Sequence, residues 1–458
     1  MRQFCTILLL SLISLALSAQ QTSYDKIAVD RHEIYVDLTD LAGGTLRGRA
    51  DLLVRSRAAK TSVLTLNLLG MEVDSVFVGG KLLDGYSVSY DGSVLDICLE
   101  RPLKAAAAPV PVTIVYHGKT VSRRFGGFSW YPEQGMAHNM GVSINDIPHS
   151  FSKSWYPAVD DFRAKSTYVM TYRVPAGLTA VGNGVLRRYD VLPDGNCEWT
   201  WEICQPVPDY LVNVAVGDYR LVHYNYDSIS SVRVPIDIYV TPDEYWEAEK
   251  AYSIIPAVLR SLENRFGAYA FDRVGFVSVN TTGGAMEHAT NISMPRRPLP
   301  TDGYRELAIH ELIHSWFGNF VTCETPGDMW LNEGITSYVV EVVLEDLVAQ
   351  GISSQTALDG YRKGVDKAAM SIPKDSPRYH PLAGTPEDDT YGTLVYKKGA
   401  WVTRQLRTLL GDEAFFRAMK QYVSEFAFGN ATTEEFKSSV EKSTGVDLTA
   451  FFKEHIYN

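Results

Sequence analysis

Cysteine is scarce in this sequence, and no long apolar run follows the N-terminal one. Only five of the 458 residues are cysteine, and no two of them show the Cys-x-x-Cys spacing of a zinc site. Four cysteines remain after the first few residues, which is too few for a disulfide framework in so long a chain. No internal repeat or low-complexity tract is present. These absences leave an ordinary globular protein of two or three domains.

Positive charge is also in short supply. The chain has 43 Lys and Arg against 54 Asp and Glu, a formal net charge of −11. Nucleic acids and anionic membranes are normally bound by a basic face. We therefore do not expect nucleic acid as a partner. The 45% hydrophobic and 21% charged residues are typical of a soluble protein with a full-sized core.

The first residues have the pattern of a secretory signal peptide. Met1 and Arg2 give a positive start, and the apolar run 7–19 ends in small residues. We expect cleavage close to Ser18 or Ala19 and export to the periplasm, the cell surface or the medium. The run is short for a membrane span. No stable span is expected after cleavage.

The rest of the chain has two parts with different sequence patterns. Residues 20–228 contain short alternating runs such as EIYVDL and STYVMTYRV, separated by turn signals such as Gly79-Gly80. They predict an antiparallel β-saddle or sandwich. Residues 229–458 begin with two strands and then become mostly helical, with apolar residues at helical spacing over 244–267. The chain is therefore predicted to be an α+β multidomain protein.

The sequence HELIH, residues 310–314, contains candidate metal ligands and a candidate general base. Asp302 is a plausible N-cap for the helix that contains it. Residues four apart project from one helical face, so His310 and His314 can bind one metal ion. Glu311 lies about 100° around the helix, where it flanks the metal as a general base rather than a ligand.

A catalytic zinc needs a third protein ligand and an open position for water. Glu333, in WLNEGITSY, follows His314 after eighteen intervening residues. It is predicted to open a second helix that lies beside the first. The His-His-Glu set then leaves one position free.

Several motifs resemble the gluzincin aminopeptidases, the family of aminopeptidase N and leukotriene hydrolase. The zinc signature of that family is similar to residues 310–322 and 328–338. Residues 154–184 resemble its β-domain stretch, and GGAMEH at 283–288 resembles its GAMEN loop. YKKGA at 396–400 resembles its tyrosine motif. The resemblance covers nearly the whole chain after the leader, and it implies a β-saddle domain followed by a thermolysin-like catalytic domain.

The resemblance also implies roles for residues. One zinc ion per chain is expected on His310, His314 and Glu333, with Glu311 as general base and Tyr396 as hydrogen-bond donor to the oxyanion. In the family the glutamate of the GAMEN loop binds the free α-amine of the substrate.

The residues of this chain that match the GAMEN loop, and are expected to bind substrate, are consecutive. Glu287 is the expected amine anchor, and the backbone of Gly284 and Ala285 is expected to lie along the peptide. Met286 and His288 complete the expected substrate contacts. His288 departs from the family, which has asparagine there.

Two further departures concern the cleft. The family has another amine-binding residue in its β-domain, but the ungapped position holds Pro148, so Asn145 or Asp146 is the alternative if the loop is shifted. Many family members also carry a C-terminal helical domain, and this chain resembles a short form without it. We expect a more open cleft, or one covered by another protomer or by the proline-rich stretch 373–386.

The leading hypothesis is a zinc aminopeptidase that acts on peptides with a free N-terminus. The alternatives are an endopeptidase or dipeptidyl-releasing enzyme on the same zinc, and a binding protein with an inactive peptidase fold. The sequence leaves open the preferred N-terminal residue and the oligomeric state.

Overall fold

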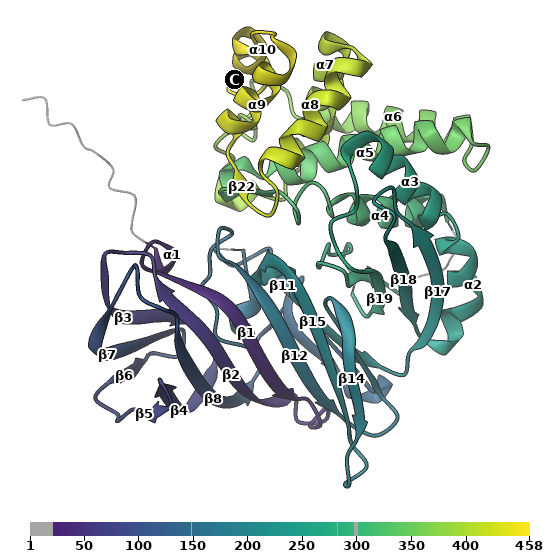
Figure 1. The fold of residues 1–458 in the computed structure, drawn as a ribbon. Helices are drawn as coiled ribbons and strands as arrows, with labels where there is room; N and C mark the ends of the chain where they lie inside the picture. The colour runs from purple at the N-terminus through teal and green to yellow at the C-terminus, as the bar shows by residue number, and fades with distance from the viewer. Residues whose placement is uncertain (1–21, 148, 282, 297–300) are drawn as a thin grey trace, which may run out of the picture.

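The computed structural model describes residues 22–147, 149–281, 283–296 and 301–458. A β-rich half is followed by a mostly helical half (Figure 1). This confirms the predicted order of β-sandwich and helical domain. The predicted signal peptide and Pro148 lie outside the described residues. Among the described helices, none has the length and apolar character needed to cross a membrane.

An eight-stranded sheet forms the larger layer of the β-rich half. Its strands, in spatial order, are β14 (Val185–Val191), β15 (Cys197–Pro208), β12 (Lys165–Val174), β1 (Ile27–Asp37), β2 (Thr45–Ser56), β8 (Val110–Lys119), β4 (Met71–Val78) and β5 (Lys81–Leu82). Neighbours are antiparallel except β1 and β12, which pair in parallel. Two strands far apart in sequence meet there, and nothing in their local patterns sets their direction.

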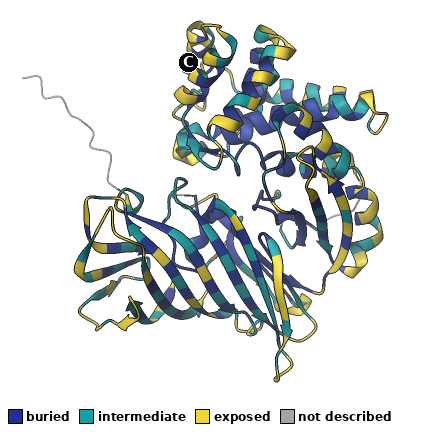
Figure 2. Ribbon diagram, viewed as in Figure 1, coloured by how far each residue is buried: buried dark blue, intermediate teal, exposed yellow. Residues whose placement is uncertain are grey.

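Two smaller sheets complete this half. The five-stranded sheet runs β13 (Thr179–Gly182), β16 (Val214–Gly217), β11 (Met136–Ser143), β10 (Gly126–Tyr131) and β9 (Ser122–Arg123). The three-stranded sheet runs β3 (Lys60–Asn67), β7 (Val94–Lys104) and β6 (Val88–Tyr90). Strands such as β12 alternate between buried and partly buried residues, as Figure 2 shows.

The four described cysteines are free thiols. Cys197 and Cys204 lie on the same strand, β15, where Cys197 is buried and Cys204 exposed.

The chain leaves the first sheets between β16 and β17. A four-stranded sheet follows, with β17 (Arg220–Asp227), β18 (Arg233–Val240), β19 (Val274–Val279) and β20 (Ile292–Pro295). The predicted domain boundary at 228 remains a prediction. The helical pattern over 244–267 forms two helices, α2 (Tyr245–Tyr252) and α3 (Ile255–Phe266). Pro256 lies in the first turn of α3, where its missing N–H is tolerated but does not continue an earlier helix.

The helical half is built around α5. Its helices are α4 (Asp302–Ile313), α5 (Trp330–Ala349), α6 (Gln355–Ala369), α7 (Gly399–Leu410), α8 (Asp412–Glu425), α9 (Thr433–Thr444) and α10 (Thr449–His455). The first fifteen residues of α5 are all buried. Helix α9 begins with a capping box, in which Thr432 and Glu435 are bonded to each other's backbone.

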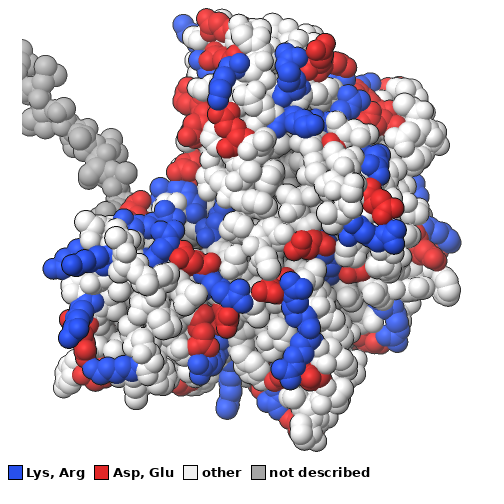
Figure 3. All heavy atoms as spheres, in the orientation of Figure 1, with Lys and Arg blue, Asp and Glu red and all other residues white. Residues whose placement is uncertain are grey.

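On the face shown in Figure 3, basic and acidic side chains are interspersed, and a band of uncharged residues lies between the two halves. No single sign of charge dominates this face.

Candidate metal and peptide site

The helix α4 positions the HELIH residues. Its N-cap is Thr301, whose hydroxyl accepts a 3.2 Å hydrogen bond from the Tyr304 N–H, and Asp302 is the first helical residue. The predicted N-cap at Asp302 was therefore wrong by one residue, because either side chain type satisfies a free N–H at this end. The face of α4 with Leu312 is buried, which fixes the rotation of the helix.

Three potential ligand atoms meet at one point. His310 Nε2 lies 3.2 Å from Glu333 Oε2 and 3.3 Å from His314 Nε2, and His314 Nε2 lies 3.3 Å from Glu333 Oε2. A tetrahedral zinc ion with bonds of about 2.0–2.1 Å holds its ligand atoms roughly 3.3 Å apart. Two imidazole nitrogens and a carboxylate oxygen at this spacing fit zinc.

The turn after α4 orients His314. The Phe317 carbonyl lies 2.8 Å from His314 Nδ1, so Nδ1–H donates to it and Nε2 is left to face the metal position. Gly318 has φ of 131°, and a Cβ on it would lie 2.9 Å from His314 Nδ1. A side chain at residue 318 would therefore push the ring away.

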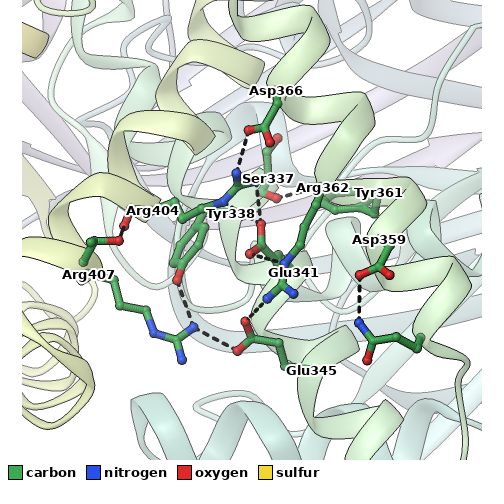
Figure 4. Close-up of polar contacts among 12 residues, drawn as sticks. Ser337, Tyr338, Glu341, Glu345, Asp359, Tyr361, Arg362, Asp366, Arg404 and Arg407 are labelled. Carbon is green, nitrogen blue, oxygen red and sulfur yellow. Dashed lines mark hydrogen bonds and ion pairs between the residues drawn. The ribbon is translucent and has the colours of Figure 1, made fainter.

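Helix α5 supplies Glu333 in its first turn, as predicted. Figure 4 shows how polar contacts hold α5 against α6 and α7. The buried Glu341 carboxylate accepts from Arg362 Nε at 2.8 Å and from Arg404 Nε at 2.9 Å. Tyr361 donates to the Ser337 carbonyl at 2.6 Å. These contacts fix the helix that carries the third ligand.

Tyr396 lies in a π-helical turn, η7 (Leu394–Lys398), directly before α7. Such turns are rare and occur often at functional sites. The Tyr396 and His310 rings are stacked with centroids 6.0 Å apart. Burial raises the pKa of Tyr396 well above its ordinary value, so the phenol keeps its proton and is a hydrogen-bond donor.

Buried carboxylates gather around His314. One atom each of Glu287, Glu311 and His314 lie within 4.8 Å of one another. Burial raises the pKa of Glu311 well above its ordinary value and raises that of Glu287. With Glu333, three carboxylates lie around His314, and such a group needs positive charge nearby. A metal ion and an ammonium group would both supply it.

A cavity of about 490 Å³ contains the site. The predicted residues that line it are Gly284, Ala285, Met286, Glu287, His310, Glu311, His314, Glu333 and Tyr396. Lining residues that the sequence did not indicate are Phe125, Val142, Ile144, Gly283, Gly303, Glu306, Leu307, Tyr361, Tyr391 and Lys397. Tyr391 is brought to the cavity by the fold and belongs to none of the quoted motifs.

The loop before β20 forms one wall. Met286 pairs with Ser293 through two backbone hydrogen bonds of 3.0 Å, which leaves Gly284 and Ala285 toward the cavity. Asn319, in the turn after α4, donates through Nδ2 to the Glu287 carbonyl at 2.8 Å. The loop and the metal-binding helix are therefore tied together.

His288 is not brought to the cavity with the others. Its side chain is 0% exposed, and Nδ1 lies 3.0 Å from Ser293 Oγ. A Cβ on Gly141 would lie 3.1 Å from His288 Nε2, so the ring points to β11 instead. A sequence position in a loop gives no direction for its side chain.

The expected β-domain anchors do not line the cavity either. Asp146 is held by Arg123 Nε at 3.0 Å and by the Ser143 hydroxyl. Asn145 is exposed. The described β-domain residues in the cavity wall, Phe125, Val142 and Ile144, are apolar.

The proline-rich stretch 373–386 does not cover the cavity. Lys374 Nζ donates to the Glu454 carbonyl at 3.3 Å, and the Leu382 N–H donates to the Ile456 carbonyl at 3.0 Å. The stretch therefore packs along the C-terminal helix, and none of its residues lines the cavity. The expectation that residues 373–386 cover the cleft was therefore wrong.

Comparison with known proteins identifies the helical half. Residues 246–455 match the Peptidase family M1 domain. The chain carries an M1 peptidase domain. The predicted gluzincin resemblance is confirmed, because this domain contains all three ligand positions.

Relatives of the M1 chain include named aminopeptidases. Aminopeptidase N of Streptomyces lividans is 25% identical over 454 residues, which are 93% of this chain and 50% of that protein. Aminopeptidase B of Rattus norvegicus is 30% identical over 323 residues, which are 68% of this chain and 47% of that protein. The M1 chain thus spans about half the length of these relatives.

Solved structures show the same fold. An M1 zinc metallopeptidase from Deinococcus radiodurans is 20% identical, with a TM-score of 0.81 over 96% of this chain and 97% of that one. A mutant of that peptidase bound to a Tyr-Ser-Ala substrate superposes with a TM-score of 0.82. A two-domain M1 architecture of this length therefore exists.

Proposed function

We propose that this M1 chain is a zinc-dependent aminopeptidase that removes the N-terminal residue of peptides. The observation that carries the proposal is the convergence of His310, His314 and Glu333 at 3.2–3.3 Å, with Glu311 and Tyr396 in the same cavity. One zinc ion per chain on the three ligands is part of the proposal. Bound zinc supplies Lewis acidity toward water and the scissile carbonyl.

Two side chains would carry the proton and the developing charge. The Glu311 carboxylate takes a proton from the attacking water and passes one to the leaving amine. Its burial raises the pKa of Glu311, which makes the carboxylate a stronger base toward that water. The Tyr396 hydroxyl donates a hydrogen bond to the oxygen of the former carbonyl as negative charge develops on it.

Glu287 gives the enzyme its exopeptidase character in this proposal. One of its carboxylate oxygens lies within 4.8 Å of an oxygen of Glu311 and a ring nitrogen of His314. It pairs with the substrate ammonium group through a charge-assisted hydrogen bond. The backbone of Gly284 and Ala285 lies along the substrate as an added strand.

The test uses the purified protein and a panel of fluorogenic aminoacyl substrates, each with an N-acetylated counterpart. Cleavage confined to the free amines is expected. Glu311→Gln is expected to keep zinc and lose about 10²–10⁴ in kcat, while chelation abolishes cleavage. Equal cleavage of acetylated and free substrates would reject the aminopeptidase proposal.

An endopeptidase on the same residues is the second candidate. The apolar β-domain wall favours it, because Phe125, Val142 and Ile144 offer no second partner for an ammonium group. An internally quenched peptide with blocked ends separates the two. Its cleavage supports the endopeptidase, and its resistance supports the aminopeptidase.

We also propose that residues 1–19 are removed during export, and that residues 20–228 and 229–458 act as a β-domain and a catalytic domain. The N-terminal pattern of charge, apolar run and small residues supports export. N-terminal sequencing of the protein from the producing cells would test it. A start at Met1 would contradict it.

A further inference from the structure

The cavity is also lined by a second group of polar residues. They are Glu306 from α4, Tyr361 from α6 and Lys397 from η7. None of them is a metal ligand or has a role in the proposed chemistry. We call these three residues the distal subsite.

Lys397 brings to the distal subsite a positive charge that has no ion-pair partner among the described residues. Over all the residues that the structure describes, its ammonium has no carboxylate within 4.0 Å and no hydrogen-bond acceptor. Its ammonium lies over the Tyr361 ring, with Nζ 6.0 Å from the ring centroid. Lys397 is only partly exposed, so water compensates its charge incompletely.

Glu306 faces the same space without pairing to Lys397. It has no ion pair or hydrogen bond with any described side chain. Both side chains line the cavity, and no ion pair between them closes this room. A substrate group that enters this room meets an ammonium on one side and a carboxylate on the other.

The order of residues along α4 places the distal subsite opposite Glu287. Glu306, His310 and His314 are successive residues four apart on one face, so about 12 Å separates the first from the last. Glu287 and Glu311 gather at the His314 end. Lys397 directly follows Tyr396, whose ring stacks on that of His310, whereas Glu287 lies beside His314. The amine anchor and Lys397 thus lie on opposite sides of the metal ligands.

The order of Glu287, the metal ligands and Lys397 sets the direction of a bound peptide. This step rests on the proposed aminopeptidase function. With its ammonium at Glu287 and its first carbonyl at Glu311 and Tyr396, the peptide runs toward Lys397. An extended tripeptide spans roughly 10 Å. Its second or third residue therefore reaches the distal subsite.

We propose that Lys397 binds a carboxylate on the leaving side of the scissile bond. Two sources share this chemistry: the free C-terminus of a di- or tripeptide, and an acidic side chain just after the bond. A lysine ammonium suits either source, because it binds as a point charge without a fixed orientation. The enzyme then favours short or acidic peptides over long neutral ones.

The test compares kcat/KM for matched substrates that begin with the preferred residue. One arm pairs a tripeptide acid with its C-terminal amide. The other pairs amidated peptides with Asp or Asn at the second position. A ratio of about tenfold in favour of the carboxylate is expected in at least one arm, consistent with a charge-assisted hydrogen bond. The arm with the larger ratio identifies the source.

Three variants make the test specific. Lys397→Met is expected to reduce the ratio to about one, because the positive charge is lost. Glu306→Gln is expected to raise the ratio, because a like charge is removed from the subsite. Lys398→Met is the matched control, since its Nζ lies 4.2 Å from the Trp401 ring centroid and the residue does not line the cavity.

A binding measurement tests the role of Lys397 independently of the proposed activity. Calorimetry on zinc-loaded Glu311→Gln measures the affinity ratio of the acid and amide peptides without cleavage. A chain that cuts no peptide would overturn the aminopeptidase proposal, and the affinity ratio would still decide the role of Lys397. An affinity ratio near one in Glu311→Gln with Lys397 intact would overturn the inference. So would a ratio that does not change when Lys397→Met is added to this variant.

Discussion

Gly334 of α5 and Gly399 of α7 touch backbone to backbone: a Cβ added to either would lie 2.8 Å from the Cα of the other. Gly334 follows the ligand Glu333 directly, and Gly399 lies three residues after Tyr396. This contact is what brings the third ligand and the tyrosine into one cavity. Only glycine at both positions allows it.

Gly334→Ala is therefore expected to push α5 away from η7. The free energy of unfolding should fall by about 1–3 kcal/mol, the usual cost of overpacking. Zinc should be lost at lower chelator concentrations than in the wild type. Chemical denaturation and zinc analysis would measure the two effects.

Gly364→Ala is the control for this change. Gly364 lies in α6, and a Cβ there meets nothing within 4 Å. Stability should stay equal or rise by about 0.5–1 kcal/mol, because alanine favours the helix. If the two variants behave alike, the contact between Gly334 and Gly399 has no special importance.

Tyr396→Phe removes the proposed donor to the oxyanion and keeps the ring that stacks on His310. We expect kcat to fall by about 10²–10³, with little change in KM or zinc content. Steady-state kinetics on one unblocked substrate would show this. Tyr391→Phe loses a hydroxyl from the same cavity and should keep most of kcat. A Tyr396→Phe variant that changes only KM would contradict the assigned role.

Local sequence patterns were sufficient to predict part of the fold and part of the candidate site. Strand alternation, the four-residue spacing of His310 and His314, and the position of Glu333 at a helix start depend on neighbouring residues alone. The structure brings these three ligands together. The helical spacing over 244–267 was also correct, but it did not predict the division into α2 and α3 before Pro256.

Other features depend on contacts between distant segments. The parallel pairing of β1 with β12, the π-helical turn at Tyr396 and the apolar wall with Phe125 all require the assembled fold. His288 shows the same limit, because its loop position suggested the cavity while its ring packs toward β11. Sequence patterns predict which residues share an element, but not where each loop side chain points.

Asn319 provides a test of how the loop and the metal-binding helix cooperate. Its Nδ2 holds the Glu287 carbonyl at 2.8 Å, and the residue is buried. Asn319→Ala should free the loop and lower kcat/KM for unblocked substrates about tenfold, the equivalent of one buried hydrogen bond. Zinc content should not change, because Asn319 is not a ligand. Loss of zinc from this variant would assign Asn319 to the metal site instead.

Lys165 makes the stability of the whole chain depend on pH. It lies on β12 in the β-rich half, and its Nζ donates to the Gly429 carbonyl of the helical half at 2.5 Å. Burial lowers the pKa of Lys165 to about 7. In the unfolded chain its pKa is about 10.4. Between these values the unfolded state binds one more proton than the folded state.

The sign of the effect follows from that difference. Below about pH 7 the ammonium is charged in both states, so the cost of burying it is fully present. As the pH rises from about 7 to about 10, the contribution of Lys165 to stability increases, by at most about 1.4 kcal/mol per pH unit. Urea denaturation across this range should show a steeper rise for the wild type than for Lys165→Met. Parallel curves for the two proteins would mean that Lys165 keeps its ordinary pKa in the folded chain.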